Sequence, residues 1–341
     1  MTLQTIKKNT VKALEESGSP TSSLDTDCLL QFFLQKDKTF ILTHHDLELT
    51  DAQISDFNLL VEKRKTGFPI AYITGVKEFY GYDFFVTPDV LIPKPDTEIL
   101  VEDAVNEIVE FYNAKLNLIS DISSKTSANK NDISSNARRV KIADICSGSG
   151  CIGLSVLKSL EEKVSDKNIF DLTMTDLSDK ALAITKKNAE SLFKNDFSKI
   201  KFLNGDLLCG ETCFDFILSN PPYVPHEMTE ELLTDGRSEP RLALDGDKDA
   251  GAKVNGDEGN SICKNITDVT DIPCNTRDGL AIIRRLIPLA FDALNCGGKF
   301  LMECGEYQTR EVKVLFEDAG FSDVKILCDL SGQERVVKGV K

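Results

Sequence analysis

Apolar residues in the first 66 positions recur at helical spacing. They form three stripes: Leu3, Ile6, Val11 and Leu14; Leu24, Cys28, Leu29, Phe32 and Phe33; and Ile54, Phe57, Leu60 and Val61. Residues three and four positions apart lie on the same face of a helix. The pattern therefore predicts a small helical domain over residues 1–66.

The pattern changes over residues 67–92. Tyr72–Thr74 and Tyr82–Val86 are rich in residues that favour strands, and Gly75 and Gly81 interrupt them. This stretch is typical of a β-hairpin. We expect it to link the helical domain to the rest of the chain.

Residues 93–341 alternate between strand-like and helix-like segments, starting with a helix after Pro93–Glu98 that Asp96 or Thr97 could cap. The expected strands are Val140–Cys146, Asp171–Asp176, Ile200–Asp206, Phe214–Asn220, Lys299–Cys304, Val324–Leu327 and Arg335–Gly339. The clearest helices between them are Cys151–Glu162, Asp179–Phe193, Gly279–Leu294 and Gln308–Ala319. Such alternation predicts an α/β domain with a doubly wound, mostly parallel seven-stranded sheet. The last two strands should pair antiparallel, because the link between them is too short for a helix.

Two polar stretches interrupt this order. Residues 117–139 are typical of a loose linker, and residues 246–277 of a solvated insertion. The insertion's acidic start resembles a calcium loop, but Ala250 stands where such a loop needs Gly and Gly256 where it needs Glu. The ten cysteines include no Cys-x-x-Cys pair. We therefore expect no metal site.

Composition narrows the class of partner. A net charge of −15 opposes non-specific binding to nucleic acid, so we expect no direct nucleic-acid partner. The N-terminus lacks the apolar core of a secretory signal, and no run of about 18 apolar residues is present. With scattered cysteines that look like reduced thiols, these features predict a cytoplasmic protein without a membrane partner.

Candidate chemistry begins where the first long strand ends, at Asp144–Gly150. Gly148 and Gly150 allow a ligand to approach the backbone, and the following helix offers free N–H groups. Asp176 ends the next strand, where an acid can accept hydrogen bonds from ribose hydroxyls; capping the next helix is its alternative role. Asp206 ends the third strand, where it could bind an adenine amino group or cap a turn.

Asn220-Pro221-Pro222-Tyr223 follow the fourth buried strand. Proline has no N–H for a sheet, so the strand must stop there. Asn220 offers an acceptor and a donor, Pro221 a free carbonyl, and Tyr223 a flat face, a set suited to a planar –NH2 group. A plain strand-to-loop turn is the alternative. The carboxyl ends of neighbouring parallel strands share one crevice, so these groups should meet.

The glycine loop, the strand-end acids and Asn-Pro-Pro-Tyr resemble class I S-adenosylmethionine-dependent methyltransferases that act on planar amino groups. Further stretches narrow the resemblance: Pro69–Gly75, Val90–Glu98, Glu239–Leu244 and Ser331–Arg335. Together they resemble the HemK/PrmC family, which methylates a glutamine side chain of peptide chain release factors. The similarity extends over nearly the whole chain.

The resemblance implies a cofactor, a partner and a set of site residues. The cofactor would be S-adenosyl-L-methionine, bound by Asp144, Cys146, Ser147, Gly148, Ser149, Gly150, Asp176, Asp206, Leu207 and Asn220. Asn220, Pro221, Pro222 and Tyr223 would bind the substrate and form the catalytic site. The partner would be a release factor, whose Gly-Gly-Gln glutamine enters as a loop. Two residues depart from the family's usual pattern: Cys146 replaces a glycine and Lys94 an arginine.

We hypothesise that Asn220 and Pro221 accept the two N–H bonds of the glutamine amide and orient its nitrogen toward the methyl group. His226 is nearby in sequence, but we interpret it as a surface residue. Four alternatives remain open: methylation of a ribosomal-protein glutamine, N-methylation of a nucleic-acid base, a nicotinamide-dependent oxidoreductase, and a binding protein with a vestigial pocket.

Overall fold

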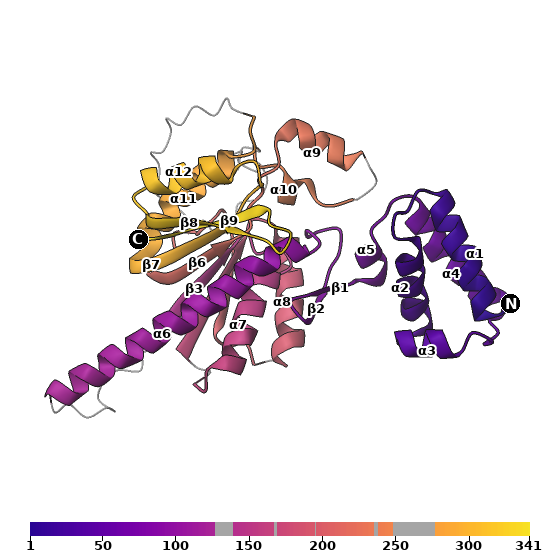
Figure 1. The fold of residues 1–341 in the computed structure, drawn as a ribbon, viewed down its shortest axis with the longest axis horizontal. Coiled ribbons are helices and arrows are strands. Elements are labelled where there is room, and N and C mark those ends of the chain that lie inside the picture. Colours follow the sequence, from indigo (N-terminus) through magenta and orange to yellow (C-terminus); the bar gives the residue numbers. More distant parts are fainter. Residues whose placement is uncertain (127–138, 167–168, 195, 235–237, 248–276) are drawn as a thin grey trace, which may run out of the picture.

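The N-terminal region is a helical unit set beside the larger sheet domain (Figure 1). The computed structural model describes residues 1–341 except 127–138, 167–168, 195, 235–237 and 248–276. The helices of this unit are α1 (Leu3–Glu16), α2 (Ser22–Leu34), α3 (Lys38–Thr43), α4 (Asp51–Lys65) and α5 (Ile70–Thr74). Thr50 begins α4 with a capping box, in which its side chain accepts from Gln53 N. Leu14, Leu29, Phe57 and Val61, all from the predicted stripes, lie in one buried cluster.

The linking hairpin is present, but its first strand lies further along than predicted. β1 (Val76–Phe79) pairs antiparallel with β2 (Tyr82–Phe85). The predicted strand at Tyr72–Thr74 is instead helix α5. Tyr72 is buried there and its hydroxyl donates to Val90 O at 2.6 Å, so a tertiary contact overrides the local strand preference.

The segment expected to be a loose linker begins as a helix. After the 3₁₀ turn η1 (Pro95–Thr97), α6 (Glu98–Thr126) continues through the first part of 117–139. Its apolar residues pack on the sheet, and its far end extends beyond the sheet in Figure 1. The prediction of a loose linker is therefore wrong for 117–126, and 127–138 lie outside the described residues.

Seven strands form the predicted sheet. They are β3 (Val140–Ile145), β4 (Phe170–Asp176), β5 (Ile200–Asn204), β6 (Phe214–Ser219), β7 (Leu294–Glu303), β8 (Ser322–Cys328) and β9 (Glu334–Val340). Their order is β5-β4-β3-β6-β7-β9-β8. β3 to β7 are parallel, and β9 runs antiparallel to both β7 and β8, as predicted.

Helices cover both faces of the sheet. The helices that pack on it are α6, α7 (Cys151–Lys163), α8 (Asp179–Phe193), α11 (Ala281–Ala293) and α12 (Thr309–Asp318). Two shorter helices, α9 (His226–Leu233) and α10 (Arg241–Leu244), lie to the side of the sheet in Figure 1. α6 and α7 share one hydrophobic cluster with the strands, while α11 and α12 share another. Ile142 of β3 belongs to the first cluster and its neighbour Ala143 to the second, because successive strand residues point to opposite faces. Burial on both faces explains why these strands are continuous apolar runs.

Among the residues described, no helix is both long and apolar enough to cross a bilayer. Every cysteine in that part of the chain is a free thiol.

Candidate active site

The predicted site residues lie at or just beyond the carboxyl ends of β3, β4, β5 and β6. The strand order reverses between β3 and β6. From β3 the chain continues to β4 on one side, whereas β6 leads to β7 on the other. Ser219 Oγ donates to Ile145 O at 2.7 Å and joins the two strand ends. Such a switch point is where open α/β sheets bind ligands. The glycine loop and Asn220 thus begin from neighbouring strands.

The glycine loop turns tightly into α7. Ser147 N donates to Thr175 O at 2.9 Å, and Gly150 N to Ser147 O at 2.7 Å. A Cβ on Gly150 would lie 2.8 Å from Thr185 Cγ2, whereas one on Gly148 would meet nothing within 4 Å. Gly150 is thus required by close packing, and Gly148 leaves open space for a ligand.

Cys146 has a φ of 61°, in the left-handed region that favours glycine. This conformation accounts for the glycine expected at the position. The side chain is partly exposed, and burial together with Asp176, Asp144 and Asp206 raises the pKa of its thiol. Cys146 therefore remains a neutral thiol among the strand-end acids.

Asp144 is fully buried beneath this loop. Its Oδ2 accepts from Gly153 N at 2.9 Å, whereas its Oδ1 has no hydrogen-bond partner among the described residues. Burial raises the pKa of the carboxyl to about 7. Buried polar atoms are normally bonded, so the free oxygen favours a ligand or water that donates to it.

Asp176 fastens the loop from β4. Its Oδ2 accepts from Gly148 N and its Oδ1 from Ser178 N, both at 2.8 Å. Ser178 itself caps α8 by accepting from Ala181 N, so Asp176 is not needed as the cap. Burial raises the pKa of the Asp176 carboxyl despite these bonds. Its place at a strand end is the one expected for a ribose acceptor.

Asp206 and Leu207, two further predicted site residues, lie just beyond the end of β5. Asp206 forms an ion pair with Arg285 of α11, a partner 79 positions away that the local sequence does not reveal. Leu207 has a φ of 48° and a side chain buried in the core. The predicted cofactor contact of Leu207 therefore concerns its backbone.

The Asn-Pro-Pro-Tyr segment is already held in place by hydrogen bonds. Asn220 Nδ2 donates to Thr97 Oγ1 at 3.4 Å, and the Tyr223 hydroxyl to Glu303 Oε1 at 3.2 Å. Gln308 Nε2 donates to the carbonyl of Tyr223 at 2.9 Å. This segment is therefore more than a turn, because side chains from three other elements fix it.

Sequence reasoning assigned no role to Glu303, Gln308 or Asn188. Glu303 ends β7 after a buried apolar run, and the rule that identified Asp176 would have found it. Asn188 is buried in α8; its Nδ2 donates to Ser149 O at 2.8 Å and its Oδ1 accepts from Phe85 N at 2.7 Å. It thereby ties the linking hairpin to the glycine loop, a contact between distant segments with no local signal.

The further stretches that resemble the family also contact one another near the candidate site. Lys94 Nζ lies 2.7 Å from Oε1 of the buried Glu239, so lysine makes one ion pair where arginine would present a planar fork. Arg335 pairs with Asp329 at 3.2 Å and with Asp96 at 3.3 Å. These pairs join the stretch Val90–Glu98 to Glu239 and to Arg335, and so bring three of the four stretches together.

The ends of the polar insertion meet beside Tyr223. Asp247 Oδ1 accepts from Gly279 N at 2.9 Å, and Gly246 N donates to Val224 O at 3.0 Å. Residues 248–276 lie outside the described part of the chain. His226, interpreted as a surface residue, is half-buried, and its Nδ1 lies 2.7 Å from Asp245 Oδ2. It is therefore engaged as a structural residue.

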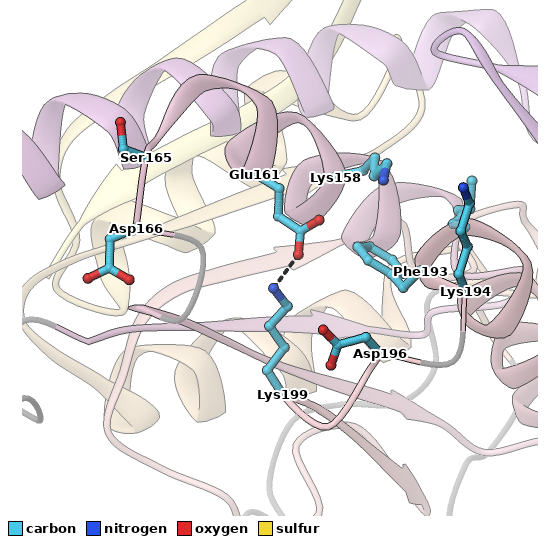
Figure 2. A pocket seen from close by; sticks show the side chains of 9 residues that line it. Lys158, Glu161, Ser165, Asp166, Phe193, Lys194, Asp196 and Lys199 are labelled. Atoms are coloured by element: carbon cyan, nitrogen blue, oxygen red, sulfur yellow. Dashed lines mark hydrogen bonds and ion pairs between the residues drawn. The ribbon is translucent and has the colours of Figure 1, made fainter.

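A cavity of about 540 Å³ lies apart from these residues (Figure 2). Lys158, Glu161, Lys194, Asp196 and Lys199 are among its lining residues, and the dashed line marks the Lys199–Glu161 ion pair. No predicted site residue lines it. Its lining mixes lysines with acids, unlike the acidic strand ends of the candidate site.

Two family models match the chain: the PrmC N-terminal domain over residues 6–75 and the methyltransferase small domain over residues 125–238. The release factor glutamine methyltransferase of Clostridium acetobutylicum is 31% identical, over 98% of both chains. That of Salmonella typhimurium is 30% identical, over 96% of this chain and 95% of the other. Among solved structures, a Pyrococcus furiosus methyltransferase aligns with a TM-score of 0.34 and 18% identity, over 60% of this chain and 76% of that one. From its full-length similarity to these relatives, the chain belongs to the release factor glutamine methyltransferase family.

Proposed function

We propose that this protein transfers a methyl group from S-adenosyl-L-methionine to the side-chain amide nitrogen of the glutamine in the Gly-Gly-Gln motif of peptide chain release factors. The observation that carries the proposal is the junction at the switch point. There the Ser219–Ile145 hydrogen bond joins the strand ends from which the glycine loop and the Asn-Pro-Pro-Tyr segment begin. This supports a cofactor site and an acceptor site that are adjacent.

The residues of the glycine loop and strand ends fit the cofactor. Asp144 Oδ1, Ser147 Oγ and Thr175 Oγ1 are buried without partners among the described residues, and such atoms suit a ligand rich in polar groups. Asp176 would bind the ribose, Asp206 and Leu207 the adenine, and residues 146–150 the methionine part. When bound, S-adenosylmethionine supplies an electrophilic methyl group on a sulfonium. The cluster of acids favours such a cation.

The acceptor residues supply positioning and electrostatic stabilisation. An amide nitrogen is a poor nucleophile, because its lone pair is delocalised into the carbonyl. Asn220 Oδ1 and Pro221 O would accept its two N–H bonds, hold it in one orientation and stabilise the positive charge that develops on nitrogen. Pro222 and Tyr223 would pack on the amide plane.

Release factors are the partner that this family membership supports best, and the cytoplasm is where we place the reaction. The net charge of −15 favours a protein substrate over a nucleic acid. The remaining candidates differ in the acceptor, which a transfer experiment identifies.

The test is transfer of tritium from labelled S-adenosylmethionine to purified release factor, followed by peptide mapping. We expect label on the glutamine of Gly-Gly-Gln and none when that glutamine is replaced by alanine. Label on a ribosomal protein or on nucleic acid instead would contradict the proposal. Calorimetry should show binding of S-adenosylmethionine and not of NADH, which excludes the oxidoreductase.

A further inference from the structure

Glu303 is a buried acid beside the Asn-Pro-Pro-Tyr segment. It ends β7, next to β6 in the sheet, and is 2% exposed. Its Oε1 accepts from the Tyr223 hydroxyl at 3.2 Å. The Thr97 hydroxyl lies near enough to lower the pKa of the carboxyl. Its Oε2 has no hydrogen-bond partner of ordinary geometry among the described residues. A buried carboxyl with one oxygen that lacks a hydrogen bond lowers the stability of the fold. Such an exception to normal bonding points to a functional reason for the residue.

Thr97 connects this acid to Asn220. A hydroxyl has one proton to donate and lone pairs to accept. If Thr97 gives its proton to Glu303, its oxygen can only accept, so it must face the –NH2 end of Asn220. The 3.4 Å contact from Asn220 Nδ2 to Thr97 Oγ1 has this polarity. Asn220 Oδ1 is then left for the acceptor amide.

We propose that Glu303 is a positioning residue for methyl transfer, which holds Asn220 through the Thr97 hydroxyl, and Tyr223 directly, in the orientation that receives the glutamine amide. The proposal rests on the proposed function and deepens it. The negative charge matters because a carboxylate only accepts hydrogen bonds. A glutamine at the same place could donate to Thr97, which frees the Thr97 proton for Asn220 and permits the flipped amide.

The charges around Glu303 predict a distinctive pH dependence. Burial raises the pKa of its carboxyl and Asp96 adds to this effect, while Thr97, Tyr223 and Arg335 lower it. The charge of Glu303 reaches the thiols of Cys304 and Cys151, whose pKa values burial already raises, so both stay neutral. As pH falls through the raised pKa, the wild-type carboxyl takes up a proton and comes to resemble glutamine.

The first test compares Glu303→Gln with the wild type at saturating substrates. We expect kcat near neutral pH to fall on the order of 10²-fold, as for a displaced reacting group, with the Kd for S-adenosylmethionine within about twofold. The ratio of variant to wild-type kcat should rise toward 1 as pH falls, because the wild-type carboxyl then becomes protonated. Protonation of Asp144 and Asp176 affects both proteins equally and cancels in the ratio. Glu317→Gln, on the exposed side of α12, makes the same change of charge and should leave kcat unaltered.

The second test separates positioning from a structural role. Thr97→Val should lower kcat about tenfold, the equivalent of one hydrogen bond, and Thr97→Ser should restore it. In the Glu303→Gln background, Thr97→Val should add little, because the chain is already broken. The melting temperature of Glu303→Gln should not fall, since the change removes a buried charge.

Several outcomes would overturn the role of Glu303: wild-type kcat in Glu303→Gln, a ratio independent of pH, or equal loss in Thr97→Ser and Thr97→Val. If Glu303→Gln fails to fold, the Thr97 pair alone decides. Absence of transfer by the wild-type protein would instead overturn the proposed function, so the two failures are distinguishable.

Discussion

The cofactor half and the acceptor half of the candidate site differ in how fully their polar groups are bonded within the chain. On the cofactor side, Asp144 Oδ1, Ser147 Oγ and Thr175 Oγ1 are buried without partners among the described residues. On the acceptor side, the side chains of Asn220 and Tyr223 are bonded to Thr97 and Glu303, and Glu303 Oε2 is the buried atom there that lacks a partner among the described residues. The first half is completed by what it binds, whereas the second is set before binding. We therefore expect changes in the first to alter affinity and changes in the second to alter rate.

The largest effect should follow Asn220→Ala. We expect kcat to fall about 10³-fold, because the group that orients and stabilises the reacting nitrogen is lost. The Kd for S-adenosylmethionine should stay within about threefold, since the loop and Asp176 are untouched. Single-turnover transfer and calorimetry measure the two quantities. A near-normal rate would remove the acceptor half from the mechanism.

Asp176→Ala should show the opposite behaviour. Loss of a charged acceptor costs about 2 kcal/mol of binding, or about 30-fold in the Kd for S-adenosylmethionine. At saturating cofactor we expect kcat to change little. Asp179→Ala, an exposed acid in the first turn of α8, serves as the control. An unchanged Kd combined with a reduced kcat would reverse the assignment of the two halves.

Gly153→Ala tests how the cofactor half is supported. A Cβ there would lie 2.8 Å from Asp144 Oδ2 and 2.9 Å from Asp144 Cβ, so the helix or the buried acid must shift. We expect the free energy of unfolding to fall by about 1–3 kcal/mol, measured by urea denaturation. Lys163→Ala, at the exposed end of the same helix, should stay within about 0.5 kcal/mol. Equal stability of the two variants would show that this contact can relax.

The sequence predicted the seven strands and the positions of most site groups, because these depend on local signals. Asp176 and Asn220 end or follow a buried apolar run, Asp144 lies one residue before the end of one, and the glycines mark the turn. Contacts between distant segments left no such signal. The Asp206–Arg285 pair and the Asn188 bridge to Phe85 join residues 79 and 103 positions apart.

Two predictions about elements were wrong for physical reasons. Tyr72–Thr74 has strand-favouring side chains, yet burial and the hydrogen bond to Val90 hold it in α5. Residues 117–126 are polar, yet they continue a helix whose apolar residues already pack on the sheet. In the first case tertiary contacts outweigh local preference, and in the second a packed helix propagates into a polar segment.

The smallest effect we predict is a gain in stability from Cys146→Gly. The φ of 61° at Cys146 strains an L-residue, and glycine relieves that strain at the cost of a more flexible unfolded chain. We expect the free energy of unfolding to rise by up to about 1 kcal/mol, measured by urea denaturation. Cofactor affinity and kcat should stay near wild type, because the neutral thiol contributes no charge to the acids around it. A loss of stability would show that the packing of the Cys146 side chain outweighs its strain. A selective loss of cofactor affinity would instead make the thiol a ligand contact, and the cofactor half would then depend on a side chain where we infer only a backbone turn.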